Sequence, residues 1–175
     1  MKGKYLYALG AALLISCSSC SAGRIHEKSY LRAVAVEDGA ERKLSLVFFS
    51  EEDAVTVSGR DTDEARENAE LKTGRAVFTG YTELIIVDGR DCRGLLEYML
   101  KEWRVSPSCR VVCGDSGLLL ECGAEELIGR AVQAEKKGIA PDCGIIRVLG
   151  ELYSKGCASV AELRGDGTAV SRVIY

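Results

Sequence analysis

One serine motif has the residue types of a nucleophilic site. Gly114-Asp115-Ser116-Gly117 has the form of the nucleophile motif of serine proteases. A serine of that kind needs a histidine that accepts its proton. The chain has one histidine, His26, which lies in a polar stretch near the N-terminus. We therefore interpret residues 114–117 as a tight turn and assign no catalytic residue.

The eight cysteines do not have the spacing of a zinc site, which needs four Cys or His ligands in closely spaced pairs. Cys109 and Cys113 lie in a predicted strand, where four residues span about 13 Å. A disulfide requires Cα atoms within about 7 Å. We expect these two to be buried free thiols and predict no metal site. Disulfides with other core cysteines stay open, since an exported protein permits them; the possible partners are Cys92, Cys122, Cys143 and Cys157.

The N-terminus has the pattern of a signal peptide. Lys2 and Lys4 form a short positive region, and an apolar segment of 11 residues follows from Tyr5 to Ile15. That segment is too short to cross a bilayer core of about 30 Å. We therefore predict export of the protein.

The end of the apolar segment resembles a bacterial lipobox. Leu14-Ile15-Ser16-Cys17 has an aliphatic residue three positions before the cysteine and a small residue just before it. We expect cleavage after Ser16 and a covalent diacylglycerol lipid on Cys17, with no other cofactor. Cys20 is the less suitable acceptor because Cys17 occupies its −3 position. Two acyl chains suffice for stable anchoring.

The composition fits one globular domain beyond this anchor. The 175 residues are 47% hydrophobic and 28% charged, with a net charge of −3. This charge lacks the basic footprint of nucleic-acid binding, so no nucleic-acid partner is expected. We divide the chain into a signal peptide (1–16), a lipid-anchored tether (17–29) and an α/β domain (30–175).

The predicted fold is α/β (α+β), a mixed β-sheet with an N-terminal antiparallel hairpin and about four packing helices. Asp38-Gly39 is a strong hairpin turn signal between strands 30–36 and 43–49. Alternation and apolar runs predict further strands. We place these at 55–57, 84–87, 109–113, 158–163 and 169–174.

Four helices follow from caps and apolar spacing. They are expected from Asp61 up to Gly74, over 91–103, over 123–137, and from Pro141 up to Gly156. Asp61 and Glu64 have the spacing of a capping box. Ala65, Ala69 and Leu71 should form the apolar face of the first helix. Ile145, Ile146, Leu149, Leu152 and Tyr153 should form that of the last. Asp88 and Asp115 stand at strand ends, where we expect them to start turns.

Four stretches, taken in order, resemble one known family. These are Glu27–Glu37, an opening strand; Val57–Ala65, with Ser58-Gly59, Thr62 and Glu64-Ala65; Phe78–Val87, with Gly80-Tyr81; and Gly94–Trp103, a helix before a strand. Together with the lipobox, they resemble the Ger(x)C spore-germination lipoproteins, the C subunits of nutrient germinant receptors. The resemblance covers residues 27–163 and concerns the N-terminal part of that family. Tyr81 stands where the family has histidine, and the Trp-Asp pair usual after the lipidated cysteine is missing.

The resemblance implies a palmitate-bearing lipoprotein on the outer face of the cytoplasmic or spore inner membrane. It implies assembly with the integral-membrane A and B subunits of the receptor and a non-catalytic role in sporulation and germination. Two alternatives stay open on the residues alone. One is an envelope lipoprotein that binds a small ligand or a cell-wall polymer. The other is an envelope thiol protein that uses a core cysteine.

Overall fold

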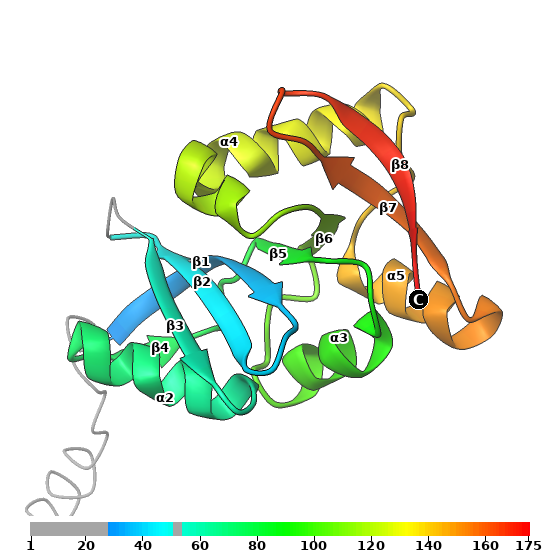
Figure 1. The fold of residues 1–175 in the computed structure, drawn as a ribbon. Coiled ribbons are helices and arrows are strands. Elements are labelled where there is room, and N and C mark those ends of the chain that lie inside the picture. The colour runs from blue at the N-terminus through cyan, green and yellow to red at the C-terminus, as the bar shows by residue number, and fades with distance from the viewer. Residues whose placement is uncertain (1–27, 51–53) are drawn as a thin grey trace, which may run out of the picture.

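A computed structural model describes residues 28–50 and 54–175, which form a mixed sheet with helices on both faces (Figure 1). The sheet has the order β3-β2-β1-β5-β6-β7-β8, and β4 pairs with β1 beside this path. The predicted α/β architecture, its N-terminal hairpin and its four helices are confirmed. The elements are β1 Lys28–Glu37, β2 Arg42–Phe48, β3 Val55–Gly59, α2 Thr62–Thr73, β4 Ala76–Phe78, β5 Leu84–Val87, α3 Cys92–Lys101, β6 Arg110–Cys113, α4 Gly117–Lys136, α5 Ile145–Lys155, β7 Ala158–Leu163 and β8 Ala169–Ile174.

Strand β1 is the centre of the sheet. It pairs antiparallel with β2, where Val34 lies opposite Leu46. Its first half pairs parallel with β4 and its second half pairs parallel with β5. Residues 33–36 are buried without alternation, because helices cover both faces of the sheet.

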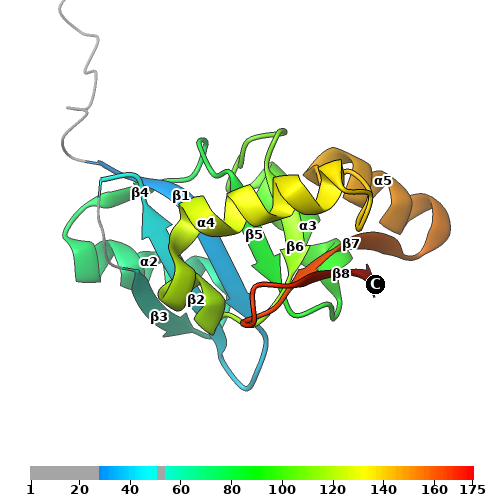
Figure 2. The ribbon, with the colours of Figure 1, turned by 90° about the horizontal axis from the view of Figure 1, so that it is seen from above.

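The helices form two unequal layers. Helix α4 crosses one face of the sheet and contacts β1, β2, β6, β7 and β8 (Figure 2). The other face is covered by α2, which contacts β2, β3 and β4, and by α5 with α3 packed against it. Strands β1, β5, β6 and β7 run parallel, so their carboxyl ends lie along one edge of the sheet and their amino ends along the other. We call these the carboxyl edge and the amino edge.

Helix α2 begins as predicted but differs in its apolar face. The Asp61 carboxylate accepts hydrogen bonds from the amides of residues 63 and 64, and Gly74 ends the helix at φ +68°. Glu64 accepts from the Arg60 amide (2.6 Å) rather than from the cap residue itself. Leu71 is 82% exposed, so its predicted burial is wrong. It follows Ala69 by two positions, which turns its side chain about 200° around the helix.

Helices α4 and α5 begin elsewhere than predicted. Helix α4 starts at Gly117, and Gly123 (φ 74°, ψ 165°) kinks it instead of opening it. Helix α5 starts at Ile145 rather than Pro141, because residues 143–145 first pair with the start of β6: the Val111 amide donates to the Cys143 carbonyl and the Ile145 amide to the Cys109 carbonyl, both at 2.8 Å.

The buried face of α5 also differs from the prediction. Ile146 and Tyr153 are exposed, whereas Ile145, Leu149, Leu152 and the unpredicted Val148 are buried. The buried set has spacing i, i+3, i+4, i+7, which is one stripe of an α-helix. Ile146 and Tyr153 each lie one position beyond this stripe.

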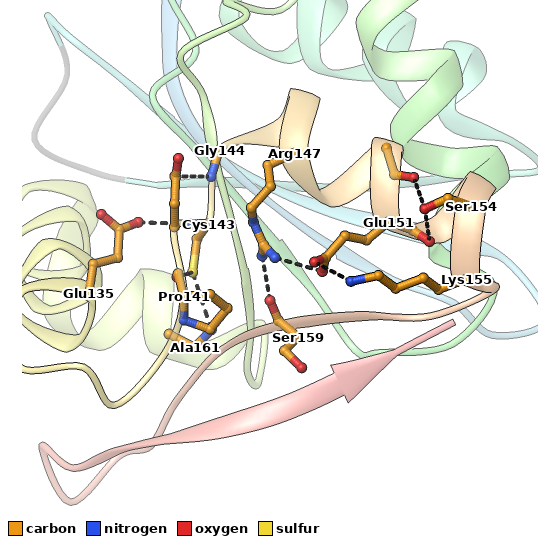
Figure 3. Close-up of polar contacts among 12 residues, drawn as sticks. Glu135, Pro141, Cys143, Gly144, Arg147, Glu151, Ser154, Lys155, Ser159 and Ala161 are labelled. Atoms are coloured by element: carbon orange, nitrogen blue, oxygen red, sulfur yellow. Dashed lines mark hydrogen bonds and ion pairs between the residues drawn. The ribbon is translucent and has the colours of Figure 1, made fainter.

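The connection between α4 and α5 is held by polar contacts around Cys143 (Figure 3). The Glu135 carboxylate accepts from the Cys143 amide at 2.9 Å. The Cys143 thiol donates to the Pro141 carbonyl and accepts from the Ala161 amide of β7, each at 3.3 Å. Nearby, Arg147 donates to Glu151 (2.6 Å) and to the Ser159 carbonyl (2.5 Å). The sulfur thus satisfies a backbone amide inside the core.

We expect Cys143→Ala to destabilise the fold more than Cys109→Ala. Both thiols are fully buried, but only Cys143→Ala leaves the Ala161 amide without a partner. An unpaired buried donor costs about 1–3 kcal/mol, which should be the difference between the two variants in urea unfolding. Cys143→Ser should recover part of this loss. Equal losses in the two alanine variants would show that the sulfur acts only through packing.

Candidate functional site

The family-like residues of the β3–α2 segment gather in one place. Gly59 ends β3, and a Cβ atom there would lie 2.4 Å from the Ala65 amide nitrogen. Ala65 is fully buried, and the Ser58 carbonyl accepts from the Asn68 amide at 2.8 Å. The small residues at 59 and 65 therefore permit the close approach of strand and helix. Their role in this structure is packing.

Thr62 faces a hollow between the first turns of α2 and α3. The hollow has a volume of about 410 Å³. Its lining is of mixed charge: Arg42, Arg60, Asp61, Thr62, Asp63, Asp91, Gly94, Leu95 and Tyr98. The sequence does not predict the contribution of β2 and α3 to this site, because no motif links residues so far apart in the chain.

The arginines of the hollow are engaged in ion pairs. Arg42 contacts the Asp38 carboxylate at 2.7 Å and donates to the Thr62 hydroxyl at 3.3 Å. Arg60 pairs with Glu64 at 2.9 Å, and this hydrogen bond lowers the pKa of the Glu64 carboxyl. The positive charges of the hollow are therefore largely balanced before anything binds.

Two groups of the hollow are less fully engaged. Asp91 precedes α3 in a left-handed conformation (φ 37°) and makes no side-chain capping hydrogen bond. The Tyr98 hydroxyl is buried and lacks a hydrogen bond of good geometry within the described part of the chain. Burial, followed by the nearby Asp63 carboxylate, raises the pKa of Tyr98 to about 12. The hollow thus offers the Asp91 carboxylate to a polar surface, above a neutral and buried Tyr98 hydroxyl.

The serine motif lies at the carboxyl edge and forms the turn from β6 into α4, as predicted. The Ser116 hydroxyl donates to the Glu37 carboxylate at 2.8 Å, which lowers the pKa of that carboxyl. The Asp115 carboxylate accepts from the Gly117 amide at 2.7 Å. Asp88 likewise accepts from the Arg90 amide at 2.9 Å. Both aspartates therefore organise turns, as expected, and His26 lies outside the described residues.

A second hollow lies beside this turn. It has a volume of about 410 Å³ and is lined in part by Asp88, Asp115, Glu162 and Arg172. Glu162 is paired with Arg164 and Arg172, each at 3.4 Å. This open site, lined by charged side chains, is the one we relate to the alternative of a small bound ligand.

The six cysteines of the described residues are all free thiols. Cys109 and Cys113 are buried, which confirms the interpretation of the pair as core thiols. Burial raises the pKa of the Cys109, Cys113 and Cys143 thiols. Burial, followed by the charge of Asp88, raises the pKa of Cys92 to about 12. Because the thiolate is the reactive form, these four are poor nucleophiles near neutral pH.

The remaining predicted residues lie elsewhere. Gly80 and Tyr81 precede β5 at the amino edge, where a Cβ atom on Gly80 would lie 2.8 Å from the Phe78 ring. The lipobox residues Leu14, Ile15 and Ser16 and the acceptors Cys17 and Cys20 lie outside the described residues. Within residues 28–50 and 54–175, the helices lack the combined length and apolar character needed to cross a membrane. In that same part of the chain, no cluster of His, Cys, Asp and Glu side chains is arranged to hold a metal ion.

Gly59→Ala should be destabilising because the added methyl meets the α2 backbone. Overpacking of a buried position costs about 1–3 kcal/mol. Gly94→Ala is the matched control, because Gly94 lies inside α3 and has open space around a Cβ atom. This control should be stabilising by about 0.5–1 kcal/mol. Thermal and urea unfolding measure both changes, and an unaffected Gly59→Ala would contradict the packing role.

The raised pKa of Cys92 predicts lower stability in alkali. The unfolded chain ionises this thiol above about pH 8.5, whereas the folded protein keeps it protonated up to about pH 12. Its contribution to stability is therefore complete below pH 8.5 and is lost as the pH rises through this window. Between pH 9 and 10, the loss should be about 1.4 kcal/mol for this thiol.

Cys92→Ala should remove this share of the pH dependence in urea unfolding at the two pH values. Leu96→Ala serves as the control, because it also removes a fully buried side chain but takes away no titrating group. It should lower stability equally at both pH values and keep the slope of the unchanged protein. A slope that Cys92→Ala leaves intact would contradict the assignment.

Comparisons with models of known protein families, with curated proteins and with solved structures found no match to this chain.

Proposed function

We propose that the chain is a membrane-anchored lipoprotein subunit of a spore nutrient germinant receptor, which acts in germination through protein–protein assembly. The observation that carries the proposal is Leu14-Ile15-Ser16-Cys17 after a short basic and apolar leader. Acylation of Cys17 would hold the domain on the outer face of the cytoplasmic or spore inner membrane. The receptor role is inferred from the resemblance of residues 27–163, in order, to the Ger(x)C lipoproteins.

The hollow between α2 and α3 supports an assembly role. The arginines of the hollow are already paired, and its Asp61 carboxylate caps α2. It offers balanced charge and the Asp91 carboxylate, which makes no capping hydrogen bond. Such a mixture suits a polar segment of a partner protein. We place contact with the integral-membrane A and B subunits here.

Anchoring increases the chance of this contact. A lipid-held domain and a membrane-spanning partner share one surface, so their encounter becomes nearly intramolecular. Weak, polar contacts then suffice for assembly. The alternative of an envelope lipoprotein that binds a small ligand or cell-wall polymer is favoured only by the second hollow, around Asp88, Asp115, Glu162 and Arg172.

The anchor is tested by metabolic labelling with an alkyne fatty acid, followed by membrane fractionation. The unchanged chain should carry the label and sediment with membranes. Cys17→Ala should lose both properties, whereas the matched variant Cys20→Ala should retain them. Label that persists in Cys17→Ala but disappears in Cys20→Ala would move the acceptor to Cys20. No label in any form would contradict the anchor itself.

The receptor role is tested by deleting the gene in the source bacterium and measuring nutrient-induced germination of its spores. We expect a loss of response to at least one nutrient, restored by the unchanged gene and by Cys20→Ala but not by Cys17→Ala. The acylated chain should also co-purify with two multi-spanning membrane proteins. Normal germination of the deletion strain on every nutrient would contradict the proposal.

A further inference from the structure

The amino edge of the sheet carries a cluster of aromatic side chains. Tyr30 of β1, Phe78 of β4 and Tyr81 have ring centroids 5.3–5.8 Å apart. Phe49, which follows β2, joins them because its amide donates to the Tyr30 carbonyl at 3.0 Å and it lines a hollow together with Tyr81. Tyr81 is 59% exposed and Phe49 is 49% exposed. We call these four residues the aromatic face.

Cationic groups lie over this face. The Lys28 ammonium is 5.5 Å from the centre of the Phe78 ring, and the Arg32 guanidinium is 5.4 Å from that of Phe49. Arg32 also pairs with Glu83 (3.0 Å) and Glu125 (3.5 Å), whose side chains are 44% and 88% exposed. Exposed pairs of this kind contribute little and are readily screened. Amphipathic rings beside long basic side chains are the residue types that anionic membrane interfaces attract.

The start of β1, which follows the predicted tether, lies at the same surface. Lys28 opens β1 at the aromatic face, on the opposite side of the molecule from the C-terminus in both views (Figures 1 and 2). Residues 18–27 separate it from Cys17. This segment reaches at most about 40 Å when fully extended. A lipid on Cys17 would therefore keep the aromatic face within a short distance of the bilayer.

We propose that the aromatic face rests on the anionic phospholipid surface to which the chain is tethered; this inference rests on the proposed lipid anchor. The rings of Tyr81 and Phe49 enter the headgroup region, and Lys28 meets the phosphate groups. Because the tether supplies a high local concentration, few such contacts are needed. Docking in this orientation turns the carboxyl edge away from the membrane. The hollow at Arg42 and Thr62 lies on that edge, since Arg42 begins β2 opposite the end of β1.

The orientation is tested with the full acylated chain in vesicles made of equal parts phosphatidylglycerol and phosphatidylcholine with brominated acyl chains, which quench nearby indole rings. The chain has one tryptophan, Trp103, which is buried and supplies a constant background. Tyr81→Trp places a probe on the aromatic face. Tyr175→Trp is the matched control: Tyr175 is 65% exposed, and its carbonyl accepts from the Cys92 amide beyond the carboxyl end of β5.

The added fluorescence of Tyr81→Trp should be quenched at least about twofold more than that of Tyr175→Trp, because aromatic rings in a membrane interface lie beside the upper acyl chains. The difference should shrink in vesicles of phosphatidylcholine alone. Equal quenching of the two variants in chains that float with the vesicles overturns the docking and leaves the anchor in place. A concentration-dependent blue shift of Tyr81→Trp without quenching assigns the face to a second copy of the chain and also overturns it. Chains that do not float overturn the anchor and the docking together.

Discussion

The arrangement depends on one strand that is buried on both faces and paired on both sides. β1 pairs with β2 along one side and, along the other, with β4 and then β5. Residues 33–36 face helices above and below the sheet and are buried without a polar interruption. A strand with neighbours on both sides and both faces covered resists a register slip or a partial detachment, because either would expose several apolar side chains at once.

The two ends of β1 lead to surfaces of different chemistry. Its start carries Lys28 and Tyr30, whose side chains lie against the Phe78 ring. Its end meets Ser116 through Glu37 and lies next to Arg42 of the charged hollow. Strands β1, β5 and β6 run parallel, so their amino ends lie together on one side of the sheet and their carboxyl ends on the other. A lipid-anchored domain built in this way can face its membrane and its partners with opposite edges.

The cysteines illustrate how one residue type takes several roles. Cys109 and Cys113 fill the core beside β6, and burial raises the pKa of both. Cys143 has a further role, because its sulfur accepts a hydrogen bond from the buried Ala161 amide. Thiols suit such sites since they pack as small hydrophobic groups and still form weak hydrogen bonds. The exported location proposed for the chain does not conflict with this, because a buried thiol is shielded from oxidants and from partner thiols.

The sequence alone determined the strands other than β4, most helix ends and the class of the fold. Local signals suffice there: Asp38-Gly39 for the hairpin, Asp61 and Gly74 for α2, Gly156 for α5. Only the tertiary structure decided that residues 143–145 pair with β6 before α5 begins and that Thr62 shares a hollow with Arg42 and Tyr98. Each of these depends on contacts between segments distant in the chain, whose free energy no local pattern encodes. The proposed anchor at Cys17 is the reverse case, because it is predicted from the order of the lipobox residues alone and needs no fold.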